Sequence, residues 1–353
     1  MQKNARWSLI EELDSSSHEA EQVLRDVHKL RSTSNVAGFA LASQQVVAAV
    51  VVLVLVAIGG VIQIIWHGQF TWFDLKRSID SFQRYDTAAA LLQNMICYFS
   101  YMFIPFILLV FCLKKNPSAI VPIRRIRQKK WLPAAVVMAL ALSFVSALVS
   151  IYIEVFLGFL HLRINVPDMV PPSQPGLVVL YVLFFCVLAP FCEEFIFRGV
   201  ILQSLRPYGN GFAILFSSLL FAMMHGNLAQ FPLAFLVGLA LGYFVIQFDS
   251  IWATILMHAS VNLMATVVNY VELRAGSMVG NLLYMGLGVG LLAIAISMIV
   301  MLRSRQSIKD WLKRTFKTPL PVSFLFKRAF LTPGMIIFTV LFILLCIAGL
   351  RIL

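Results

Sequence analysis

Charged residues are scarce in this chain. Only 12% of its 353 residues are Asp, Glu, Lys or Arg, whereas 60% are hydrophobic and the mean hydropathy is +0.87. Soluble domains usually contain about 25% charged residues, so the composition excludes an ordinary soluble protein. The five cysteines fall inside apolar segments without a repeating spacing, which excludes a disulfide framework or a cysteine zinc cluster. No basic stripe rich in aromatic residues is present, so we expect no nucleic-acid partner.

Apolar segments of about the length that crosses a bilayer occupy most of the remaining chain. There are nine of them, at approximately 44–66, 88–113, 132–160, 176–203, 212–226, 228–247, 251–270, 279–302 and 332–352. None alternates as a barrel strand does, and lipid satisfies no backbone hydrogen bonds, so each must be helical. The fifth is short and could join the sixth as one re-entrant element. We therefore predict an all-α, polytopic transmembrane helix bundle of eight to nine spans.

Polarity divides the chain into four parts. Residues 1–43 form a polar tail with an amphipathic helix, which a capping box at Ser16 and Glu19 introduces. Residues 44–113 carry two accessory transmembrane spans, and residues 132–302 form the core of the bundle. Residues 303–353 combine a basic linker with a last span.

Basic residues predict the orientation. The loop 114–131 carries seven Lys or Arg and no acid, and the loop 303–331 carries eight against one Asp. By the positive-inside rule both loops are cytoplasmic. With nine spans the N-terminus is then cytoplasmic and the C-terminus lies outside. The net charge of +12 is concentrated in these loops, so we expect them to contact anionic lipid headgroups.

Glycines spaced four apart predict close helix packing. Two such pairs occur, Gly238 with Gly242 and Gly286 with Gly290. The "GLGVG" stretch at 286–290 follows no strand, so we exclude a nucleotide-binding loop there.

Ionisable residues at membrane depth cluster in the stretch "FCEEFIFRG" at 191–199. Each such charge costs roughly 2.5–3.5 kcal/mol on insertion scales and marks a functional site by default. Glu194 and Arg198 are four residues apart and can pair on one helix face. Glu193 is rotated by about 100° and is left without that partner. Pro190 lies one turn earlier, so we expect the helix backbone to open near these carboxylates.

Two further helices each present a polar face. Phe221 and His225 are four apart in the fifth segment, and His258 and Asn262 are four apart in the seventh. Hydrolysis of an amide needs a base for water, a group for the leaving-group proton and donors for the oxyanion. Glu193 with His225 can supply the first two, and His258 with Asn262 can supply the third.

Three motifs appear in one order in these helices. They are EExxxR at Glu193, Glu194 and Arg198, FxxxH at Phe221 and His225, and HxxxN at His258 and Asn262. In this combination the chain resembles the CPBP family, the type II CAAX prenyl proteases and bacteriocin-processing intramembrane proteases, also called the Abi family. The resemblance covers roughly residues 132–302 and says nothing about the first two spans or the last one.

The resemblance implies an intramembrane endopeptidase built from helices. Glu193 and His225 would activate water, and His258 and Asn262 would bind the oxyanion. Glu194, Arg198 and Phe221 would support them. The substrate would be a membrane-associated protein or peptide, and a bacterial plasma membrane is the expected location.

A zinc ion is the alternative to metal-free catalysis. The HExxH spacing is absent, but Glu193, His225 and His258 from separate helices could still hold zinc. We favour hydrolysis without a cofactor. Two other classes of protein also stay open. The polar cluster could serve an ion- or proton-coupled transporter, although no repeated half is apparent, or the chain could be a non-catalytic membrane scaffold or immunity protein.

Overall fold

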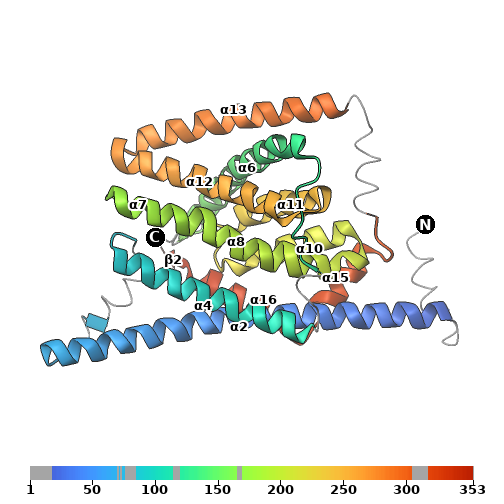
Figure 1. Ribbon diagram of the computed structural model, residues 1–353, viewed down its shortest axis with the longest axis horizontal. Helices are drawn as coiled ribbons and strands as arrows, with labels where there is room; N and C mark the ends of the chain where they lie inside the picture. The colour runs from blue at the N-terminus through green and yellow to red at the C-terminus, as the bar shows by residue number, and fades with distance from the viewer. Residues whose placement is uncertain are drawn as a thin grey trace.

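The computed structural model describes residues 18–69, 71, 74–75, 85–113, 120–164, 169–303 and 317–352. The chain forms a bundle of roughly aligned helices (Figure 1). Its longer helices are α2 (His18–His67), α4 (Ala88–Cys112), α6 (Leu132–Phe159), α10 (Asn210–Met224), α11 (Phe231–Phe248), α12 (Ile251–Ala275), α13 (Ser277–Arg303), α15 (Val322–Phe330) and α16 (Pro333–Ala348). The fourth span is built from shorter consecutive pieces over 175–205, which are described with the site.

The all-α membrane bundle is confirmed. Within the described residues, seven helices are long and apolar enough to cross a bilayer, and the bent pair α15 and α16 raises this number to eight. The pair is bent by 84° at the break before Pro333. The predicted fifth span is helix α10, which has only 15 residues. The span count therefore agrees roughly with the eight to nine that hydropathy predicts.

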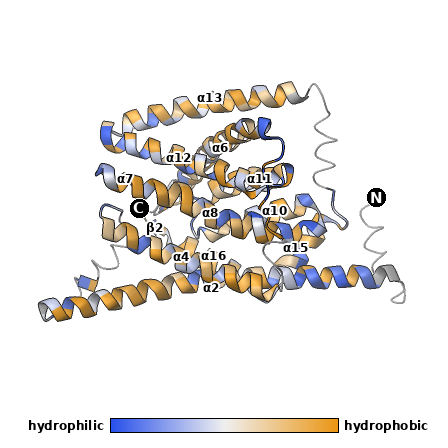
Figure 2. Ribbon diagram, in the orientation of Figure 1, coloured by the Kyte–Doolittle hydropathy of each residue, from blue (hydrophilic) through white to orange (hydrophobic). Residues whose placement is uncertain are grey.

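The first helix joins two parts that the sequence analysis separates. Helix α2 runs through residue 43 without a break, so the predicted tail helix and the first span are one rod of 50 residues. Figure 2 shows this rod changing from hydrophilic at its start to hydrophobic along its length. Leu30 is fully buried, whereas Leu24 of the same predicted apolar face is 61% exposed. The predicted cap residue Ser16 lies outside the described residues.

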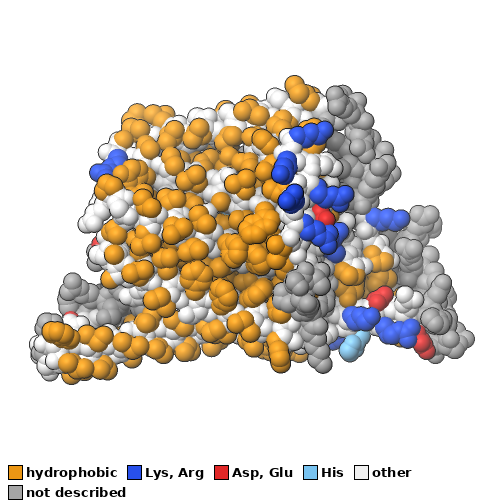
Figure 3. All heavy atoms as spheres, in the orientation of Figure 1, with side chains coloured by type: hydrophobic (Ala, Val, Ile, Leu, Met, Phe, Trp, Pro, Cys, Tyr) orange, Lys and Arg blue, Asp and Glu red, His pale blue; other side chains and the backbone are white. Residues whose placement is uncertain are grey.

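The two ends of the bundle differ in charge. Lys and Arg side chains gather at one end of the molecule, where α2 also begins (Figures 1 and 3). There Arg124 pairs with Asp249 at 2.8 Å, which fixes the basic loop to the turn between α11 and α12. At the opposite end, strand β1 (Leu162–Ile164) pairs antiparallel with β2 (Leu350–Ile352). The N-terminal helix thus begins at the basic end, and the last strand lies at the other end.

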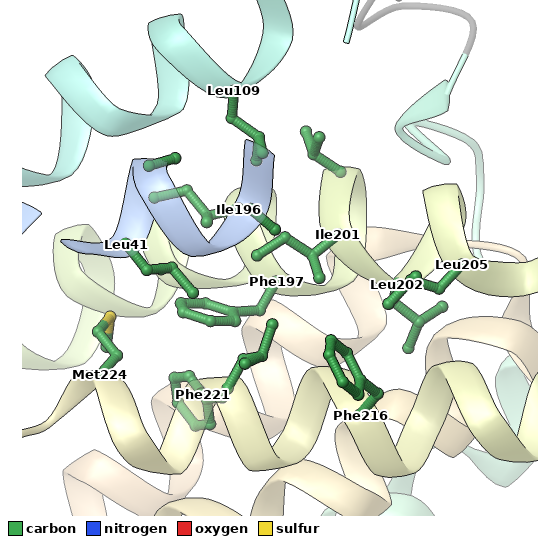
Figure 4. Packing of buried hydrophobic residues seen from close by; sticks show 14 of the residues in the cluster. Leu41, Leu109, Ile196, Phe197, Ile201, Leu202, Leu205, Phe216, Phe221 and Met224 are labelled. Atoms are coloured by element: carbon green, nitrogen blue, oxygen red, sulfur yellow. The ribbon is translucent and has the colours of Figure 1, made fainter. Parts of the chain in front are cut away.

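The fourth span lies at the centre of the main hydrophobic core. Figure 4 shows Leu41 of α2 beside Phe197 of this span, with Phe221 of α10 across the ring. The rings of Phe197 and Phe221 have centroids 5.1 Å apart. Fixing these buried side chains also fixes the depth of the polar residues on the same helices.

Glycines allow the closest helix contacts, as predicted for one of the two pairs. A Cβ at Gly238 would lie 3.2 Å from Ser218, and one at Gly242 would lie 3.2 Å from Ile214, so both glycines face α10. The prediction for Gly286 and Gly290 is wrong, because both face open space. The glycine between them, Gly288, is the one that faces α6 and contacts Phe144.

Helices α2 and α16 cross at a second pair of glycines. A Cβ at Gly38 would collide with the backbone of Gly334, and a Cβ at Gly334 would collide with that of Asn35. The side chain of Asn35 accepts a hydrogen bond from the Gly334 amide at 2.8 Å. The C-terminal helix therefore docks on α2 through backbone contact, which only glycine permits.

We predict that Gly38→Ala destabilises the protein by about 1–3 kcal/mol, because the added methyl group forces α2 and α16 apart. Gly59→Ala on the same helix is the matched control, since nothing lies within 4 Å of a Cβ there. Thermal unfolding of the purified protein in detergent measures both. Equal melting temperatures for the two variants would contradict the crossing.

Candidate active site

The fourth span contains two π-helical segments, which flank the carboxylates. It runs through α7 (Pro175–Val182), π segment η2 (Leu183–Leu188), α8 (Ala189–Glu194), π segment η3 (Phe195–Ile201) and α9 (Leu202–Leu205). In a π turn each N–H bonds to the carbonyl five residues earlier, as the Ala189 amide does to Phe184. Such π segments are rare and frequently lie at functional sites. Glu193 and Glu194 end the short α-helical piece between them.

Pro190 opens the backbone where the sequence predicts it. The next π bond would run from residue 190 to the carbonyl of Phe185, but proline has no N–H to donate. The side-chain amide of Asn262 donates to that carbonyl instead, at 2.8 Å. This hydrogen bond replaces the missing backbone bond and connects α12 to the fourth span. It also sets the direction of the Asn262 side chain.

Glu194 and Arg198 form the predicted ion pair. Arg198 Nη1 donates to Glu194 Oε1 at 2.9 Å, and both side chains are fully buried. Arg198 also donates to the Gly238 carbonyl at 3.3 Å, and its guanidinium lies 4.3 Å from the centre of the Phe221 ring. The missing side chain of Gly238 leaves room for this guanidinium. One buried cation therefore joins α8, α10 and α11.

His258 lies between the two carboxylates. Its Nδ1 is 3.0 Å from Glu194 Oε1, and its Nε2 is 3.7 Å from Glu193 Oε2. Because an ionised carboxylate only accepts hydrogen bonds, Nδ1 carries the proton in the contact with Glu194. This contact turns Nε2 of His258 toward Glu193.

His225 caps the C-terminal end of α10. Its Nδ1 is 2.9 Å from the carbonyl of Phe221, one turn earlier. A carbonyl only accepts, so Nδ1 carries the proton and neutral His225 has its lone pair on Nε2. The ring of Phe221 packs edge-on against His225 and His258, with centroids 5.1 and 5.7 Å away. Phe221 therefore holds both imidazoles in place.

Glu193 has a partner that the sequence analysis missed. The hydroxyl of Tyr98, on α4, lies 2.7 Å from Glu193 Oε1 and 3.3 Å from the carbonyl of Ala189. A tyrosine in an apolar span is common, so nothing in the sequence distinguished Tyr98 from its neighbours. Its contribution depends on how α4 docks on the fourth span.

A cavity of about 520 Å³ lies within the bundle and collects the predicted residues. Glu193, His225, His258 and Asn262 line it together. Glu194 and Arg198 are fully buried and do not line the cavity. The accessory helices also line it, with Gln44, Gln45, Ala48 and Val52 from α2 and Asn94, Cys97, Tyr98, Tyr101 and Met102 from α4. The first two spans therefore belong to the site, although the family resemblance did not extend to them.

Glu193, His225 and His258 are also the zinc ligands that the sequence suggests as an alternative. In the described part of the chain, no three His, Cys, Asp or Glu side chains form a group that could hold a metal ion. Glu193, His225 and His258 form no such group in this structure.

Comparison with known proteins gives one match. Residues 175–264 match the family model described as Rce1-like, type II CAAX prenyl endopeptidase. The matched segment begins at α7 and ends two residues after Asn262, so it contains all three motifs. No curated protein and no solved structure matches the chain. Over residues 175–264, where its polar cavity residues are concentrated, the chain is therefore similar to the Rce1-like family of type II CAAX prenyl endopeptidases.

Proposed function

We propose that the protein is an intramembrane endopeptidase that hydrolyses a peptide bond of a membrane-associated protein or peptide with activated water. The observation that carries this proposal is the cavity in which Glu193, His225, His258 and Asn262 meet. Two of them are acid–base groups, and two can donate hydrogen bonds to an oxyanion. The family match supports the reaction class.

Glu193 is the base in this proposal. Water attacks the scissile carbonyl carbon and gives its proton to the Glu193 carboxylate. Nε2 of His225 holds the second hydrogen of the water, because its lone pair is free for this contact. When the tetrahedral intermediate collapses, the C–N bond breaks and the proton from Glu193 passes to the leaving amine. Atoms and charge balance without a covalent enzyme intermediate.

Asn262 and His258 hold the oxyanion. The Asn262 amide has two hydrogens, of which one is used by the Phe185 carbonyl and the other is available to substrate. His258 Nδ1–H is used by Glu194, so its Nε2 can donate only when the ring carries both protons. Donors prepared before reaction are worth roughly 2.7–4 kcal/mol each.

The surroundings of the site fit a substrate that is associated with the membrane. The cavity lies inside a bundle whose outer helix faces are apolar (Figures 2 and 3). At the basic end, Arg124 and Arg206 line an open pocket of about 530 Å³. We propose that this end faces the cytoplasm of a bacterial cell, as the positive-inside rule predicts, and contacts anionic lipid headgroups there.

We predict that Glu193→Gln keeps the fold but lowers cleavage of a peptide substrate by roughly 10²–10⁴-fold, the usual loss when a general base is removed. Glu154→Gln is the control, because it makes the same change on α6 at an exposed position outside the cavity. Rates are measured on purified protein in lipid vesicles. Near-normal cleavage by Glu193→Gln would refute the assignment of the base.

Glu194→Gln should have a different signature, because it leaves Arg198 buried without its partner. Breaking such a pair costs about 3–5 kcal/mol of folding free energy. Adding Arg198→Met should restore part of the melting temperature. It should not restore activity, because His258 still lacks the carboxylate that orients it. A stable Glu194→Gln protein with full activity would contradict both roles.

We expect peptidase activity to survive exhaustive chelation, and the purified protein to contain less than stoichiometric zinc. Elemental analysis and activity after dialysis against a strong chelator check this. Loss of activity that added zinc restores would show that the site changes conformation to bind metal and would replace the mechanism above.

A further inference from the structure

Tyr98 lies outside the segment that matches the family model, yet its hydroxyl forms a hydrogen bond with Glu193. Tyrosine has a single hydroxyl hydrogen, which can go to Glu193 Oε1 at 2.7 Å or to the Ala189 carbonyl at 3.3 Å. The shorter contact is to a charged acceptor, and charge-assisted hydrogen bonds are the stronger ones. The hydroxyl therefore donates to Glu193.

We infer that Tyr98 is a positioning residue for the base: its hydrogen bond holds Glu193 Oε1, so that Oε2 is directed at His258 and the cavity. This inference rests on the proposed function. The two carboxylate oxygens then have separate tasks, since Oε1 is fixed by α4 and Oε2 lies 3.7 Å from His258 Nε2 and accepts the proton of water. Without the donor, the carboxylate can rotate about its last bond and present either oxygen.

Packing makes Tyr98 a rigid donor. The residue is only 8% exposed. Its ring meets Phe184 and Tyr101 edge-on, with centroids 5.3 and 5.2 Å away. Phe184 belongs to the π segment that precedes Glu193, so the ring and the carboxylate are held by the same part of the fourth span. Helix α4 is thereby a part of the catalytic unit and more than an accessory span.

Tyr98→Phe tests the inference, because it removes one oxygen and keeps the ring contacts. We expect kcat to fall about 10- to 100-fold with KM changed less than about threefold, since misplacing a reacting group slows chemistry more than binding. Tyr284→Phe is the matched control. It removes a hydroxyl that donates to the Ser143 carbonyl at 3.4 Å, and neither residue lines the cavity, so kcat should be unchanged.

A double-mutant cycle separates positioning from a general packing defect. If Tyr98 acts through Glu193, Tyr98→Phe should change the residual rate of Glu193→Gln by less than about twofold. A loss of the same size in both backgrounds would overturn the inference and give Tyr98 a purely structural role. A wild-type kcat in Tyr98→Phe would also overturn the inference. If Glu193→Gln is inactive in the same assay, the proposed function stands.

Infrared difference spectra give a readout that needs no turnover. The carboxylate band that disappears in Glu193→Gln belongs to Glu193. This band should shift in Tyr98→Phe, because Oε1 loses its donor, and should stay in place in Tyr284→Phe. An unshifted band would overturn the hydrogen bond whatever the activity assay shows. If Glu193→Gln instead cleaves normally, the proposed function fails in its choice of base, and this spectrum still decides whether Tyr98 holds the carboxylate.

Discussion

The buried pair of Glu194 and Arg198 is the interaction on which the site depends. A charge that is fully removed from water needs partners, and this pair contacts residues of several helices. Arg198 reaches Gly238 of α11 and the ring of Phe221 on α10, and Glu194 reaches His258 of α12. Any movement of one of these helices would leave a charge or a donor unpaired. The desolvated pair thus fixes the relative positions of the residues that are proposed to perform the chemistry.

Irregular backbone contributes the second constraint. The π segments on both sides of α8, together with Pro190, leave a carbonyl of the fourth span without its normal donor. In a membrane such a carbonyl costs several kcal/mol unless a side chain satisfies it. Asn262 does so, and the same amide keeps a second hydrogen for substrate. An irregularity in the helix backbone therefore specifies the orientation of Asn262, a residue of the proposed reaction.

The helices outside the family segment complete the cavity. Helices α2 and α4 supply one wall of it, and α16 docks on α2 through Gly38 and Gly334. Helix α16 is thus connected to the candidate active site through α2. A segment of about a quarter of the chain thus carries the motifs, and helices α2 and α4 outside it help to enclose them.

The sequence by itself determined the fold class and the main polar residues. Hydropathy predicts spans because lipid leaves the backbone no alternative to helices, and spacing of four predicts the Glu194–Arg198 pair because it is a contact within one helix. Only the tertiary structure decided the partners of Glu193, the role of Phe185 and which glycine of the 286–290 stretch faces α6. Tyr98 is one aromatic residue among many in apolar spans, and its hydroxyl gains a function only where α4 meets the fourth span. Contacts between helices depend on register and rotation, and local periodicity does not encode these.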